Sequence, residues 1–123
     1  MMMNRTLMTL AAAALLAAGA CAQAAPAKAA DGVLVAANGM TLYVFDKDMG
    51  GKSACNGPCA KNWPPLAAAD ADKAEGDWTM ITRDDGSKQW AYKGKPVYAF
   101  VKDQKPGDRT GDGFNNVWHA ATP

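Results

Sequence analysis

A ten-residue pattern that occurs twice constrains the fold of this chain more than any other feature. The copies run over 39–48 and 94–103, and both read Gly-x-x-apolar-Tyr-x-Phe-x-Lys-Asp. Tyr43 corresponds to Tyr98, 55 positions later, and the Gly, Phe, Lys and Asp positions follow at the same offset without a gap. Self-similarity at a fixed spacing indicates duplicated structural units that share one core.

The duplication also defines the boundaries of the predicted units. The same offset of 55 carries Trp63 onto Trp118. We therefore expect one repeat over 31–66 and a second over 86–121, joined by a linker over 67–85. Together they have the length of one small domain rather than two.

Short apolar stretches separated by turn residues favour β-structure. Asn38-Gly39, a strong hairpin signal, separates 33–35 from 41–45. A second turn is predicted at 84–87, between two further stretches with a two-residue period. These signals predict antiparallel hairpins.

The duplicated aromatic residues are expected to form the core. Tyr43 and Phe45 fall on one face of a strand, and Tyr98 and Phe100 do the same in the second copy. We expect both pairs to fill one shared core, with the repeats related by a pseudo-twofold axis. The predicted fold is a small all-β domain, an antiparallel sheet or barrel-like structure built from two pseudo-symmetric repeats with long loops.

The first residues have the features of an export signal. The predicted signal peptide covers 1–24, with an apolar run over 10–20 that is too short to span a bilayer and a cleavage site near 20–25. An alternative is lipid attachment at Cys21, within a sequence that resembles a lipoprotein box. The segment 25–30 is expected to be a flexible tether.

Composition excludes some classes of partner. The chain has 13 Lys and Arg against 12 Asp and Glu, a net charge of +1. This balance argues against nucleic acid and against electrostatic binding to an anionic membrane surface. We expect the single domain over 31–123 to contact a membrane only through a lipid on Cys21.

Cys55 and Cys59 allow three interpretations. A structural disulfide is typical of small exported domains. With the sole histidine, His119, the two thiolates would instead form a soft three-coordinate site suited to Cu(I). The third interpretation is a redox-active dithiol, although such pairs usually have two intervening residues and this one has three.

Two aspartates end the duplicated pattern. Asp48 and Asp103 are expected to accept hydrogen bonds from loop amides and to hold turns. The loop after the second one also contains Asp108 and Asp112 among glycines, so that Asp103, Asp108 and Asp112 would offer oxygen ligands to Ca²⁺. Copper and calcium are thus alternatives, and no cofactor is expected otherwise.

The motifs together resemble a known family, the bacterial secreted-repeat lipoproteins that carry a Yx(F/W/Y)xxD motif. The resemblance covers the whole mature chain and implies an exported, often lipid-anchored protein with tandem repeats and no assigned reaction. The residues that carry it are Tyr43-x-Phe45-x-x-Asp48, Tyr98-x-Phe100-x-x-Asp103, Cys55-x-Gly57-x-Cys59, Trp63-Pro64-Pro65-Leu66, Gln89-Trp90-Ala91-Tyr92, Pro106-Gly107-Asp108 and Trp118-His119.

No catalytic constellation is recognisable in the sequence, so we expect no enzyme. The favoured function is a non-catalytic binding or interaction module with a Cys55–Cys59 disulfide, located in the periplasm or outside the cell and in one form lipid-anchored to the outer membrane. Its partner would be an unknown envelope component or a small ligand. The alternative is a periplasmic copper-handling or redox protein that uses Cys55, Cys59 and His119.

Overall fold

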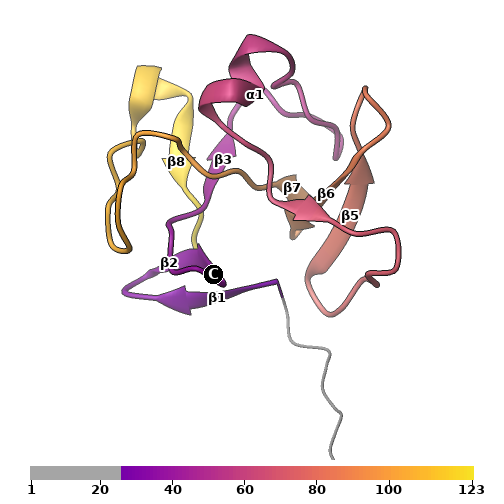
Figure 1. The fold of residues 1–123 in the computed structure, drawn as a ribbon, viewed down its shortest axis with the longest axis horizontal. Helices are drawn as coiled ribbons and strands as arrows, with labels where there is room; N and C mark the ends of the chain where they lie inside the picture. Colours follow the sequence, from indigo (N-terminus) through magenta and orange to yellow (C-terminus); the bar gives the residue numbers. More distant parts are fainter. Residues whose placement is uncertain (1–25) are drawn as a thin grey trace, which may run out of the picture.

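The computed structural model describes residues 26–123 (Figure 1). The predicted signal peptide and Cys21 lie outside the described residues. In chain order, the elements are β1 (Ala27–Ala30), β2 (Val33–Ala36), β3 (Tyr43–Phe45), α1 (Pro58–Asn62), β4 (Ala67–Ala68), β5 (Trp78–Thr82), β6 (Lys88–Tyr92), β7 (Lys95–Pro96), the 3₁₀ turn η2 (Phe114–Asn116) and β8 (Trp118–Ala120).

The strands form three small antiparallel sheets. β1 pairs with β2, β3 pairs with β8, and β6 lies between β4 and β5 and also pairs with β7. The β3–β8 pair lies on one side of the molecule and the β6 sheet on the other, with α1 and the β1–β2 hairpin at opposite ends (Figure 1). This arrangement confirms the predicted all-β fold. Within 26–123 no helix has the length and apolar character needed to cross a membrane.

The two repeats exchange strands with each other. β3 belongs to the first repeat and β8 to the second, and their register places Tyr43 opposite Ala120. The equivalent bridge on the other side joins Pro65 of the first repeat to Tyr98 of the second. Because proline has no backbone N–H, this second pairing cannot continue as a regular ladder. Each repeat therefore supplies the segment that pairs with the aromatic strand of the other.

A pseudo-twofold axis passes between Tyr43 and Tyr98. The amide of Tyr43 donates to the carbonyl of Tyr98 at 2.8 Å, and the amide of Tyr98 donates to the carbonyl of Tyr43 at 2.9 Å. These residues are equivalent in the duplication, so the exchange of hydrogen bonds between them is symmetric. The predicted pseudo-symmetry is present in the backbone itself.

Four aromatic rings form a continuous stack across this axis. The ring centroids of Phe45 and Trp118 lie 4.2 Å apart, those of Trp118 and Trp63 lie 3.8 Å apart, and those of Trp63 and Phe100 lie 3.9 Å apart. The order Phe, Trp, Trp, Phe is itself symmetric under the offset of 55. Such stacking adds to the free energy gained by burying the rings.

A second hydrophobic cluster joins the hairpins. It contains Leu42 and its equivalent Val97, together with Leu34, Trp78 and Trp90. The two tryptophans meet edge to face, with centroids 6.3 Å apart. All four tryptophans of the chain are thus buried in one of the two clusters.

Two predicted boundaries differ from the structure. The predicted tether over 25–30 contains β1, and the predicted linker over 67–85 contains β4 and β5. Alanine has low strand propensity, so the Ala-rich sequence of β1 resembles a linker. Asp31 and Gly32, with φ of 51° and 86°, form the two-residue turn that joins β1 to β2.

Candidate functional site

The aspartates of the repeat motif are bound by tyrosines from the opposite repeat. The hydroxyl of Tyr43 donates to Oδ2 of Asp103 at 2.6 Å, and the hydroxyl of Tyr98 donates to Oδ2 of Asp48 at 2.6 Å. Both tyrosines are completely buried. Burial and the acceptor carboxylate raise the pKa of each phenol well above its ordinary value. The motif therefore encodes two crossed hydrogen bonds between the repeats.

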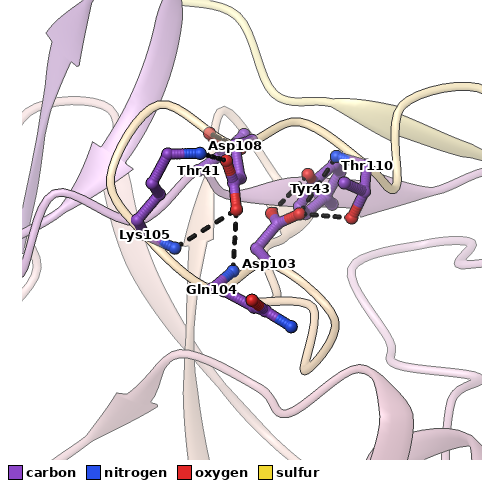
Figure 2. Close-up of polar contacts among 7 residues, drawn as sticks. All are labelled: Thr41, Tyr43, Asp103, Gln104, Lys105, Asp108 and Thr110. Atoms are coloured by element: carbon purple, nitrogen blue, oxygen red, sulfur yellow. Dashed lines mark hydrogen bonds and ion pairs between the residues drawn. The ribbon is translucent and has the colours of Figure 1, made fainter.

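The second oxygen of each carboxylate holds a loop. The amide of Ala54 donates to Oδ1 of Asp48 at 2.6 Å, and the amide of Thr110 donates to Oδ1 of Asp103 at 3.0 Å. Figure 2 shows the carboxylate of Asp103 between Tyr43 and Thr110. The sequence analysis expected these loop contacts but did not foresee the tyrosine donors.

A buried arginine links the two repeats at the disulfide loop. The guanidinium of Arg83 donates from Nη1 to Ser53 Oγ at 3.0 Å and to Gln89 Oε1 at 2.7 Å, and from Nη2 to the carbonyl of Cys55 at 2.6 Å. Ser53 Oγ in turn lies 2.6 Å from the hydroxyl of Tyr98. The role of Arg83 was not predicted from the sequence, because an arginine beside an Asp-Asp-Gly turn has the pattern of a solvated surface.

The network around Arg83 reaches Asp48 through Tyr98. Burial raises the pKa of Asp48 above its ordinary value, and the hydrogen bonds from Tyr98 and Ala54 and the charge of Arg83 oppose this rise. A carboxylate held in this way supports the loop and the opposite repeat at the same time. Its position between two structural donors assigns it to the framework of the site.

Cys55 and Cys59 form a disulfide. Copper ligation requires thiolates, which a disulfide does not offer. His119 lies on β8, where its Nε2 is 2.8 Å from Oδ2 of Asp46. In the part of the chain that the structure describes, no three His, Cys, Asp or Glu side chains gather closely enough to bind a metal ion. The structure does not assemble the copper site.

The three aspartates of the calcium interpretation also bind separate partners. Asp103 holds Tyr43, as described above. Oδ2 of Asp108 accepts the amides of Gln104 and Lys105, and Oδ1 of Asp112 accepts the amide of Ala120 (Figure 2 for Asp108). The carboxylates therefore close their own turns, and among residues 26–123 they do not form a cation cage.

An open groove lies between β3 and β7. Its first hollow has a volume of about 320 Å³, and its second, about 400 Å³, continues past the end of β8. Val44, Asp46 and Lys95 line both hollows, so the two are adjacent. Phe45 and Asp48 line the first, and Tyr92 and His119 line the second. Phe45, Asp48 and His119 were candidate residues on sequence grounds, whereas the groove was not predicted.

Two segments of the chain, 25–67 and 79–122, match the model of a family described as a secreted repeat of unknown function. The chain belongs to this family. The matches begin close to β1 and β5, so the unit of the family includes the hairpin that precedes each aromatic strand. The description of the family as secreted agrees with the expected export. No curated protein and no solved structure matches the chain.

Proposed function

We propose that this protein is a non-catalytic binding module of the cell envelope that takes a small polar ligand in the groove between β3 and β7. The observation that carries the proposal is the groove itself, whose lining includes two charged side chains, Asp46 and Lys95, that bond to no core residue. Ligand sites are typically concave, with volumes of about 300–1,000 Å³ and a few convergent polar groups on an apolar lining.

The contrast between polar residues that stabilise the fold and a polar residue without an internal ion-pair partner supports this function. Tyr43, Tyr98, Asp48 and Asp103 are engaged with one another, and these bonds stabilise the fold. In contrast, the ammonium group of Lys95 forms no ion pair within residues 26–123. Groups without an internal partner are the ones that a ligand can engage.

The groove is also accessible. The side chains of Asp46 and His119 are 51% and 45% exposed, although they bond to each other. Val44 and Phe45 are half-buried and give the groove an apolar floor. The proposal places the module in the periplasm or outside the cell, and a lipid on Cys21 would tether it to the outer membrane.

Chemical-shift mapping by NMR tests the function. The ¹⁵N-labelled, disulfide-bonded protein would be titrated with three classes of small polar compounds: neutral oligosaccharides, dipeptides and dicarboxylates. We expect at least one class to give saturable shifts at Asp46, Gly50, Gly94 and Lys95. Lys102→Ala, which removes an exposed lysine outside the groove, is the matched control for Lys95→Ala. Shifts confined to other surfaces, or no shifts with any class, would exclude the proposed function.

A further inference from the structure

The pseudo-symmetry relates the first hollow to a hollow of similar volume, about 330 Å³, in the other half, and the two differ in their lining. Under the offset of 55, Gly51 and Gly94 of the first hollow correspond to Pro106 and Gly39. Pro106 packs closely against Gly39, because a Cβ on Gly39 would lie only 3.1 Å from Cβ of Pro106. Gly51 carries no side chain, and a Cβ on Gly94 would meet no atom within 4 Å. The contact between Pro106 and Gly39 is therefore absent from the half that holds the first hollow, where glycines form the lining.

A hydrogen bond is the second difference between the linings of the two hollows. Oγ1 of Thr41 donates to the carbonyl of Asp108 at 2.7 Å, and this ties the loop after Asp103 to the turn before β3 (Figure 2 labels these residues). The position equivalent to Thr41 is Pro96, which has no hydroxyl and lines the open hollow. The first hollow therefore lacks both the proline contact and the threonine hydrogen bond, and it differs from its counterpart in lining rather than in volume.

The pocket offers donors and acceptors side by side. The amides of Gly50 and Gly51 bond to no backbone acceptor in the described part of the chain, and the Lys95 ammonium is unpaired there. Asp46 uses Oδ2 for His119. Its Oδ1 accepts no hydrogen bond from the residues described and is available as an acceptor.

An aromatic ring borders the same pocket. Phe45 stacks on Trp118 on one side, with ring planes 13° apart, and contributes to the lining of the hollow. The carboxylates of Asp46 and Asp48 are balanced along the groove by Lys93 and Lys95. A balanced set of charges favours neither an anion nor a cation, whereas alternating donors and acceptors suit hydroxyl groups, each of which donates and accepts.

From this geometry we infer that the groove binds a neutral polyhydroxylated ligand, a sugar unit of a glycan, with its hydroxyls on Asp46, Lys95 and the glycine amides and its apolar face towards Phe45. This inference rests on the proposed function and specifies the class of its ligand.

Titration of the disulfide-bonded protein with cellotriose and with N,N′,N″-triacetylchitotriose tests the inference by ¹⁵N NMR. We expect at least one of these sugars to shift the amides of Gly50, Gly51, Gly94 and Lys95 with saturation. Since a hydrogen bond to a charged group contributes about 1.5 kcal/mol or more, Lys95→Ala should weaken binding about tenfold. Asp46→Asn should weaken it as well, and Lys102→Ala should leave it unchanged.

The comparison ligands are triglycine, a zwitterion, and citrate, an anion. If triglycine or citrate shifts the groove amides and neither sugar does, the sugar inference is overturned while the proposed binding function stands. If none of the four compounds shifts these amides, both are overturned. Spectra of the free variants that overlay on the wild-type spectrum away from the groove would show that each substitution preserves the fold.

Discussion

The hydroxyls of Tyr43 and Tyr98 are the residue-scale link between the two halves of the protein. Each donates to a carboxylate that belongs to the other repeat, and each is buried beside that acceptor. Removing the tyrosine donor would leave a buried carboxylate without its hydrogen bond. Such an unpaired group lowers the free energy of unfolding by about 1–3 kcal/mol or more. Loss of any one of the four groups should therefore lower the stability by an amount of this order.

Alkaline pH should destabilise the protein through these two phenols. The pKa of each is raised in the folded state, whereas an unfolded tyrosine titrates near about 10. The stabilisation is therefore complete below pH 10 and is lost as pH rises towards the folded pKa. Urea unfolding at pH 8 to pH 11 should show a falling free energy of unfolding, and the Tyr43→Phe/Tyr98→Phe variant should show a smaller fall. An equal fall in both proteins would contradict this.

At the scale of elements, the loop before β8 passes very close to the stacked aromatic rings. Gly111 lies in the loop before β8, and a Cβ there would lie 2.6 Å and 2.8 Å from ring atoms of Trp63 and 3.0 Å from Phe100. The loop can pass the stack only because this position has no side chain. The disulfide loop also contacts this cluster through Cys55, whose carbonyl accepts a hydrogen bond from Arg83.

Gly111→Ala should cost about 1–3 kcal/mol of stability, because the added methyl group overlaps the Trp63 ring in a packed core. Urea unfolding followed by tryptophan fluorescence would measure this. In a Trp63→Leu background the smaller side chain leaves space, so the same substitution should cost less there. Additive losses in the double variant would show that the two residues do not compete for space.

Removing the disulfide should weaken the protein without unfolding it. The bond between Cys55 and Cys59 closes a loop of only five residues, so the chain-entropy estimate of its contribution is about 2 kcal/mol. The contacts of Arg83 with the loop remain after reduction. Cys55→Ala/Cys59→Ala should therefore keep one cooperative thermal transition at a lower temperature. A variant that is unfolded at 25 °C would contradict this expectation.

Local sequence patterns predicted which segments form strands and turns better than they predicted which strands pair with each other. The duplication, the Asn38-Gly39 turn and the buried aromatic faces follow from residue type and spacing. The strand exchange does not, because a sequence that pairs within each repeat would show the same alternation. The groove escaped prediction for a similar reason, because its lining comes from segments far apart in the sequence, such as Asp46 and Lys95, which only the fold brings together. Arg83 was missed because burial of a charge at a turn has no local signature.

At the scale of the whole molecule, strand exchange makes the two repeats one folding unit. A single repeat has neither the partner for its aromatic strand nor the acceptor for its tyrosine. The exposed segment over 70–77 joins the halves, so covalent continuity there is not needed for packing. The two repeats therefore form one interlocked domain and not two independent domains in tandem.

Separately produced halves, 26–72 and 73–123, should each be unfolded and should fold when mixed. Each half exposes the apolar surface that the other covers, and far- and near-UV circular dichroism would follow the recovery. The near-UV signal of the stacked tryptophans should appear only in the mixture. A half that shows this signal and a cooperative transition by itself would contradict the exchange.

Double-mutant cycles on the tyrosine and aspartate pairs test the central claim, the crossed connection of the repeats, most directly. Free energies of unfolding would be measured for Tyr43→Phe with Asp103→Ala and for Tyr43→Phe with Asp48→Ala. The structure predicts a coupling of about 1 kcal/mol or more for the crossed pair and little coupling for the pair within one repeat. Strong coupling between Tyr43 and Asp48, with none between Tyr43 and Asp103, would show that each repeat closes on itself.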